Sequence, residues 1–191
     1  MNQIIHNPDV RLHEVTCITE EEKQLIEAWN QTERDYPKHL SIPELLNERI
    51  KAQPDHPALV EGERTFTYEE LGQEIRRLAN SLVENGVQPG DAVAVYMNRS
   101  ADAVITMLAI LHAGAAYVPI DPAQPDERIS WMLEDSGVSI VLYAESQPPV
   151  DESIKAVHVT GMSHQSQAEL SVQTSPSQLA YIMFTSGSTG R

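Results

Sequence analysis

Glycine and hydroxyl side chains gather near the end of the sequence, in the run Thr185, Ser186, Gly187, Ser188, Thr189 and Gly190. Glycine permits positive φ and close backbone approach, so several N–H groups of such a run can point at one anion. Serine and threonine hydroxyls add donors for phosphate oxygens. The run predicts a phosphate-binding loop, although by composition alone such a run is more often a flexible turn or linker.

The residues before this run favour the binding interpretation. Leu179–Phe184 is an apolar stretch that predicts a buried strand. In a doubly wound sheet, ligands bind at the carboxyl ends of strands, and this position makes the two interpretations about equally strong. The run is not a Walker loop, which ends in Gly-Lys followed by Ser or Thr.

Strands and helices that alternate along the chain would position this loop. Apolar strands without polar alternation are expected at 92–97, 116–120, 138–143 and 179–184, with a weaker one at 156–159. Helices are expected over 101–113 and 125–136, and the polar residues 160–178 predict a surface loop. This order predicts an α/β fold with a mostly parallel sheet covered by helices on both faces.

Capping boxes mark three helix starts nearer the amino terminus, because Thr19, Ser41 and Thr67 are each followed three residues later by glutamate. The apolar residues of the second helix recur at helical spacing and predict one packed face, namely Ile42, Leu45, Leu46 and Ile50. Short runs at 58–60 and 64–67 predict a β-hairpin.

Composition excludes several classes of function. The 191 residues include 13 basic and 28 acidic side chains, for a net charge of -15. Such a chain repels phosphate backbones, which argues against a nucleic-acid partner, although a loop of amides can still hold one nucleotide. The composition is that of a soluble globular protein, with 41% hydrophobic and 21% charged residues.

The sequence gives little indication of a disulfide, a metal site or a membrane span. Cys17 is the only cysteine, so no intramolecular disulfide can form and a cytoplasmic setting is expected. His158 and His164 lack the second pair of ligands that a zinc site needs, so no metal site is predicted. The apolar stretch 101–116 contains a charged residue and is shorter than the ~20 residues of a spanning helix, so no membrane span is expected.

Phe184–Gly190 resembles the phosphate-loop motif of the ANL superfamily of adenylate-forming enzymes. That motif has Tyr or Phe, Thr-Ser-Gly, Ser or Thr, Thr-Gly, one variable residue and Pro-Lys-Gly. Arg191 occupies the variable place. Leu111–Pro122 resembles the second core motif of adenylation domains of nonribosomal peptide synthetases, and Thr67–Leu71 resembles the first. His112 stands where lysine is usual, and we expect it on a helix surface.

The resemblance implies activation of an amino acid by ATP as aminoacyl-AMP, with Mg²⁺, and transfer to the phosphopantetheine thiol of a carrier domain. It implies that Thr185 to Gly190 hold the β- and γ-phosphates. It assigns no catalytic residue and no metal ligand to this chain, since those of the family lie downstream. Periodicity predicts a packing role for four motif residues, Leu71, Leu108, Leu111 and Tyr117.

The same resemblance divides the chain. Residues 1–40 are expected to form an amino-terminal segment with a linker helix, and residues 41–191 the amino-terminal part of an AMP-binding domain that ends inside the phosphate loop. We expect this part alone to be inactive. Two alternatives stay open: an acyl- or aryl-CoA synthetase of the same superfamily, and a non-catalytic nucleotide-binding fragment. Ala116–Pro122, which is typical of the amino-acid-activating branch, favours the peptide synthetase.

Overall fold

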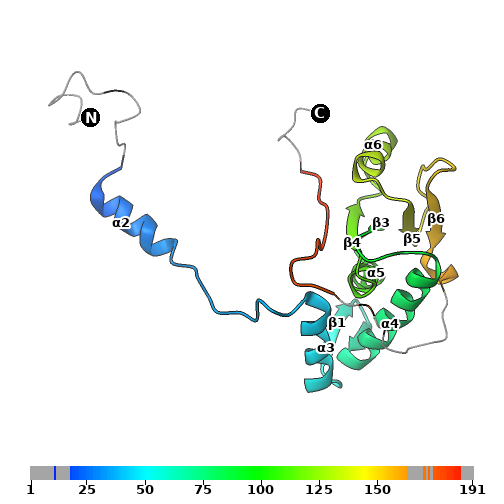
Figure 1. Ribbon diagram of the computed structural model, residues 1–191, viewed down its shortest axis with the longest axis horizontal. Coiled ribbons are helices and arrows are strands. Elements are labelled where there is room, and N and C mark those ends of the chain that lie inside the picture. The colour runs from blue at the N-terminus through cyan, green and yellow to red at the C-terminus, as the bar shows by residue number, and fades with distance from the viewer. Residues whose placement is uncertain (1–10, 12–17, 163–169, 171, 173, 186–191) are drawn as a thin grey trace. The chain divides into compact units, whose positions relative to one another are not determined.

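The computed structural model describes residues 11, 18–162, 170, 172 and 174–185 (Figure 1). The chain divides into two compact units, Met1–Pro37 and Lys38–Arg191. The first contains helix α2 (Glu20–Trp29), which begins at the predicted capping box of Thr19 and has no buried residue. The second contains the other described helices and all the described strands.

A parallel sheet forms the centre of the second unit. Its four strands are β3 (Ala92–Tyr96), β4 (Ala116–Ile120), β5 (Ile140–Tyr143) and β6 (Lys155–His158). Their order is β4-β3-β5-β6, and each neighbouring pair is parallel. The predicted strands are therefore present within two residues of their expected bounds, except for the last one.

Helices cover both faces of this sheet, as the sequence predicts. Helices α4 (Tyr68–Glu84) and α5 (Ala101–His112) share one apolar cluster with Val93 and Val95 of β3. Helix α6 (Asp126–Ser136) shares a second cluster with Ala94 and Tyr96. Successive residues of a strand point to opposite faces, so β3 supplies the floor of both clusters. Figure 1 shows α6 apart from α4 and α5.

Helix α3 (Ile42–Ala52) packs less completely than its periodicity predicts. Ile50 is buried and Leu46 is half-buried, but Ile42 is 49% and Leu45 38% exposed. The helix approaches its neighbours at a glycine, since a Cβ on Gly72 would lie 2.8 Å from Ile50 Cδ1. The predicted helix is present, but of its four aligned apolar residues only Leu46 and Ile50 turn inward, together with Pro43.

The predicted hairpin is confirmed as β1 (Pro57–Glu61) and β2 (Arg64–Thr67). It is fastened to the start of α5. Glu61 Oε1 accepts a hydrogen bond from Ala101 N at 3.1 Å, and Arg64 lies 3.3 Å from the Asp102 carboxylate. A carboxylate at a helix amino terminus satisfies an orphan N–H and complements the helix dipole.

Two sequence expectations near the end of the chain need correction. The residues 179–184 do not form a buried strand: they make one parallel bridge, between Tyr117 and Tyr181, and Leu179, Tyr181 and Met183 are 51 to 60% exposed. They add to the outer edge of β4, where no described strand covers them in turn. The segment 160–178 is not wholly a surface loop, because Met162 is 1% exposed within the core.

Within the part of the chain that the structure describes, no helix has the length and apolar character that a membrane crossing requires.

The capping boxes allow a test of which helices support the fold. Replacing Thr67 by Ala removes the side chain that accepts from Glu70 N at 3.2 Å and should lower the free energy of unfolding by about 1 kcal/mol. Thr19→Ala removes the same bond from α2, which buries nothing, and should leave the main urea-unfolding transition unchanged. Equal effects of the two substitutions would contradict this assignment.

Candidate functional site

The approach to the predicted phosphate loop is held by backbone pairing with β4. Tyr117 N donates to Ala180 O at 3.1 Å, and Ile182 N donates to Tyr117 O at 3.0 Å. Both polar groups of the Tyr117 backbone are therefore used to fix the position and register of residues 180–182. In Figure 1 the orange-red segment runs beside β4.

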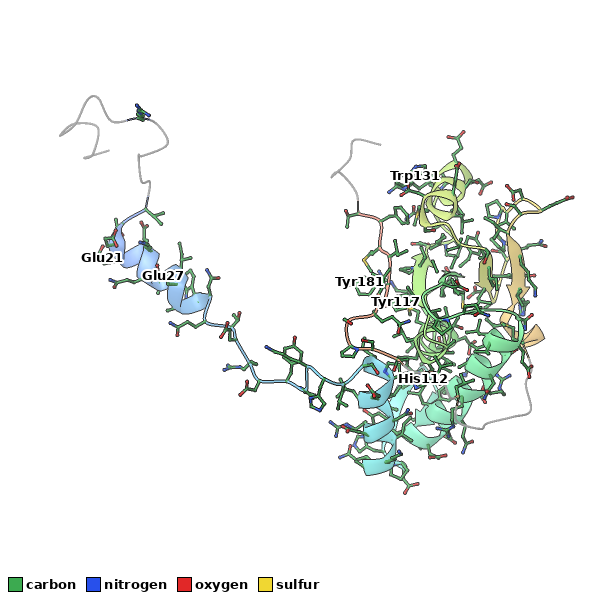
Figure 2. The ribbon with its side chains drawn as sticks, viewed as in Figure 1. Glu21, Glu27, His112, Tyr117, Trp131 and Tyr181 are labelled. Atoms are coloured by element: carbon green, nitrogen blue, oxygen red, sulfur yellow. The ribbon has the colours of Figure 1, made fainter. Side chains whose placement is uncertain are left out.

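Aromatic contacts hold the same segment on both faces of the sheet. Tyr181 stacks on Tyr117, with ring centroids 5.7 Å apart and an angle of 29° between the planes (Figure 2). On the α6 side, Phe184 meets Trp131 edge to face at 5.1 Å. Burial raises the pKa of Tyr117 and the neighbouring Tyr181 adds to this, so the stacked ring of Tyr117 is neutral at pH 7.

Gly114, in the second core motif, is the next point of attachment upstream. Its carbonyl accepts from Gly90 N at 2.8 Å and also from the side-chain amide of Gln178. Its φ is +77°, and a Cβ there would lie 2.9 Å from Val172 Cγ1. Glycine is required here both by the backbone conformation and by the close approach of the segment that leads to the loop.

The bridge register places the start of the loop at the carboxyl edge of the sheet. Tyr181 lies opposite Tyr117 in a parallel bridge, so continuation of that register sets Thr185 opposite Asp121, one residue past the end of β4. Thr185 is exposed there. The other predicted loop residues, Ser186 to Gly190, lie outside the described residues, and their role stays a prediction.

A cavity of about 690 Å³ opens at this edge. Its walls come from the turns after β3 and β4 and from the last described residues before the loop. Arg99 and Asp121 supply charge, and Met183 and Phe184 line it beside the loop. The carboxyl edge of an α/β sheet is the usual place for a ligand, and the volume is in the range of small-molecule sites.

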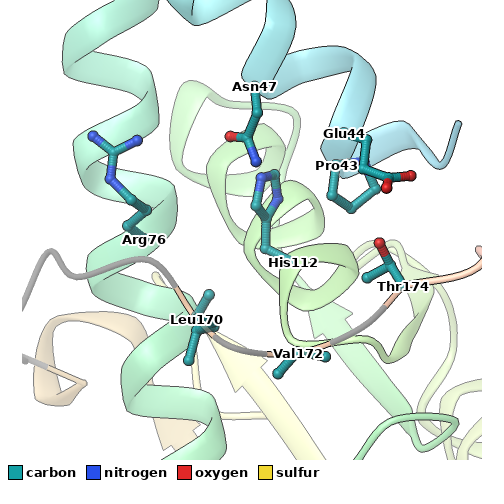
Figure 3. Close-up of a pocket in the computed structure, with 9 residues that line it drawn as sticks. Pro43, Glu44, Asn47, Arg76, His112, Leu170, Val172 and Thr174 are labelled. Atoms are coloured by element: carbon teal, nitrogen blue, oxygen red, sulfur yellow. The ribbon is translucent and has the colours of Figure 1, made fainter.

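A second cavity, of about 430 Å³, lies between α3, α4 and α5 and away from this edge (Figure 3). It contains Glu44, Arg76 and His112. The expectation of a surface position for His112 is wrong, since the ring is half-buried and lines this cavity. Nδ1 lies 2.8 Å from Leu108 O, a carbonyl that can only accept, so the proton of the neutral ring is on Nδ1.

Burial lowers the pKa of the His112 imidazole. The hydrogen bond to Leu108 raises that pKa, and the Arg76 charge lowers it again, with burial the largest of the three causes. The neutral ring is thus the form that the fold favours.

Of the other histidine and cysteine residues considered in the sequence, one has a structural role and two cannot be placed. His158 Nε2 lies 2.6 Å from Ala144 O and Nδ1 2.7 Å from Thr160 Oγ1, so both ring nitrogens are engaged. His164 and Cys17 lie outside the described residues.

Comparison with known proteins gives the family. The model of the AMP-binding enzyme family matches residues 46–191, and the chain belongs to this family. Tyrocidine synthase 3 of Brevibacillus parabrevis is 38% identical over 194 residues, which cover 100% of this chain and 3% of that protein. Surfactin synthase subunit 2 of Bacillus subtilis (strain 168) is 40% identical over 176 residues, 90% of this chain and 5% of that protein.

Solved structures share the fold. The nonribosomal peptide synthetase FmoA3 in its AMPPNP-bound form matches with a TM-score of 0.77 and 30% identity, over 88% of this chain and 18% of that chain. The amino-terminal subdomain of Klebsiella oxytoca NpsA, in complex with 3-hydroxybenzoyl-AMSN, matches with a TM-score of 0.72 and 29% identity, over 78% and 38%. The resemblance to peptide-synthetase adenylation domains is confirmed, and the chain spans 3 to 5% of the length of the two curated relatives named above.

Sequence reasoning missed the side chains that fasten the loop approach. Trp131, Arg128 and Gln178 lie in helical or polar stretches whose patterns indicate packing or a surface loop. Their partners are far away in sequence, so no local pattern identifies them. The sequence gives one indication of the contact with Trp131, namely the aromatic Phe184 directly before the glycine-rich run.

Gly114 is constrained both by its positive φ and by a close neighbour, and comparison with Gly86 separates the two effects. Both have positive φ, of +77° and +97°, but nothing lies within 4 Å of a Cβ on Gly86. Gly86→Ala should cost about 1–2 kcal/mol of backbone strain. Gly114→Ala should cost at least about 1 kcal/mol more, because Val172 and Pro89 must move. Urea unfolding measures both, and equal costs would contradict the close contact.

The environment of His112 predicts a pH dependence of stability. The unfolded chain takes up a proton at an ordinary histidine pKa of about 6.5, while the folded state resists protonation of His112. The unfolded state then binds more protons, so the free energy of unfolding should fall as the pH drops below about 6.5.

His112→Gln should reduce this decline between pH 7.5 and 5.5 in thermal unfolding, whereas the exposed His39→Gln should reduce it less. A decline that is the same in wild type and His112→Gln would show that His112 is not its source.

Proposed function

We propose that this chain is the amino-terminal part of an amino-acid-activating adenylation domain of a peptide synthetase. The observation that carries the proposal is the geometry at the sheet edge: two backbone hydrogen bonds from Tyr117 bring the segment before Thr185 to the carboxyl end of β4. Membership of the AMP-binding family and the peptide-synthetase relatives support it.

In the proposed reaction, the carboxylate of the amino acid attacks the α-phosphorus of ATP and pyrophosphate leaves. The part of this chain is to bind and orient the leaving group, with Thr185, Ser186, Gly187, Ser188, Thr189 and Gly190 as the phosphate loop. Backbone amides and hydroxyls held in place before the reaction stabilise the charge that develops on pyrophosphate. Mg²⁺ enters with ATP, and the proposal gives it no ligand among these residues.

Local groups must overcome the overall charge of the chain. The net charge of -15 repels a nucleotide, but Arg99 lines the cavity beside the loop and the loop amides act at contact distance. The acidic field is screened beyond about 8–10 Å at physiological salt, whereas the amide contacts are not.

The proposal extends to partner, place and domain organisation. The aminoacyl group would pass to the phosphopantetheine thiol of a carrier domain, and the reaction would take place in the cytoplasm, as the single cysteine favours. Residues 41–191 would belong to the AMP-binding domain, which agrees with a family match from residue 46 and with the start of α3 after Ser41. Residues 1–40 would be a linker segment with α2.

Amino-acid-dependent ATP–pyrophosphate exchange tests the proposal. The assay uses the natural polypeptide that carries these residues, with amino acids, fatty acids and aryl acids as separate substrates. We expect exchange with one or a few amino acids. Exchange only with fatty or aryl acids would identify a CoA-ligase type of enzyme, and no exchange with any acid would contradict the proposal.

Loop variants test the assigned residues. Ser186→Ala and Thr189→Val each remove a hydroxyl that can donate to phosphate, so each should reduce exchange by about 10–100-fold, the loss expected for a hydrogen bond to a charged group. Ser177→Ala is the matched control, since Ser177 is exposed upstream of the bridge. Equal activity of the control and the loop variants would remove the loop from the mechanism.

A further inference from the structure

Trp131 stands out because it is the partner of the last residue before the predicted loop. Its ring meets Phe184 at 5.1 Å and 68°, an edge-to-face arrangement. The guanidinium of Arg128, one turn earlier on α6, lies over the Trp131 ring at 4.6 Å from its centroid. Three side chains from two separate parts of the chain thus make consecutive contacts, Arg128 over Trp131 and Trp131 against Phe184.

The other end of the same short segment is fixed from the opposite face. Tyr181 stacks on Tyr117 of β4, and the backbone on either side of Tyr181 is bonded to Tyr117. Leu179 and Met183 are 59 and 60% exposed, whereas Ile182 and Phe184 pack against the cluster on the α6 side, so Phe184 anchors the chain just before Thr185.

We infer that Trp131, braced by Arg128, is a positioning residue for nucleotide binding: by holding Phe184 it sets the direction in which the chain enters the phosphate loop at Thr185. This rests on the proposed function. An unanchored entry would let the loop amides sample other directions, and ATP binding would then have to order them. The contact touches no reacting atom, so its loss acts on the affinity for ATP.

Kinetics of the natural polypeptide that carries these residues provide the test. Trp131→Ala should raise the KM for ATP by about two- to tenfold, the factor that corresponds to an aromatic pair, with kcat and the KM for the amino acid changed less. Trp131→Phe, which keeps a ring, should restore most of the ATP affinity. Trp29→Ala makes the same substitution at the other tryptophan, 67% exposed on α2, and should change neither constant.

A general loss of structure would give a different pattern. It would raise both KM values or lower kcat, and Trp131→Phe would not rescue ATP affinity selectively; either pattern overturns the inference. An unchanged KM for ATP in Trp131→Ala also overturns it. If Trp131→Ala does not fold, Phe184→Leu removes the same contact from the loop side and should give the same selective rise.

Fluorescence provides a reading that does not need turnover. The emission of the natural polypeptide minus that of its Trp131→Phe variant isolates the contribution of Trp131, whatever other tryptophans that polypeptide contains. A non-hydrolysable ATP analogue with Mg²⁺ should change this contribution with saturation, and Phe184→Leu should abolish the change. Calorimetric binding of the analogue without an emission change overturns the inference alone. Absence of both nucleotide binding and exchange in the wild type overturns the proposed function.

Discussion

The parallel bridge at Tyr117 is the interaction on which the candidate site depends. Its two hydrogen bonds join residues 180–182 to the edge of β4. Among the described residues, they are the backbone hydrogen bonds between this segment and the sheet. In a parallel arrangement, register decides how far the next residues extend past the end of the neighbouring strand. The bridge therefore directs the chain toward the carboxyl end of β4, the edge at which ligands bind in α/β sheets.

Both core motifs support this edge through packing. The second motif supplies Gly114, whose carbonyl accepts from Gly90 N and from the Gln178 side chain, and Tyr117, whose backbone pairs with residues 180–182 just after Gln178. The first motif caps α4 through Thr67, and α4 packs with α5 on one face of the sheet. Residues of a family motif can thus serve mainly to pack the fold, as Gly114 and Tyr117 do here. In this chain the second motif attaches residues 180–182 to strand β4.

The cavity at the carboxyl edge and the one between α3, α4 and α5 differ in chemical character. The one at the carboxyl edge combines methionine side chains with Arg99 and Asp121, and it adjoins Phe184. The one between α3, α4 and α5 contains Glu44, Arg76 and a neutral His112, away from the loop. An imidazole whose Nδ1 is bonded to Leu108 is accommodated there as a neutral ring. The departure from the usual lysine therefore lies in a different cavity from the one at the carboxyl edge.

The sequence by itself determined the order and type of the elements, because helix caps, glycine stops and continuous apolar runs are local signals. It also determined the family, because Leu111–Pro122 and Phe184–Gly190 match family motifs, and such matches are read directly from the sequence. Only the tertiary structure decided that residues 179–184 make a single bridge, and that Ile42 and Leu45 of α3 stay exposed while Ile50 is buried. The contact of Trp131 with Phe184 also came from the structure. Exposure and ring contacts of this kind join residues distant along the chain, and such pairs leave no periodic trace in a single sequence.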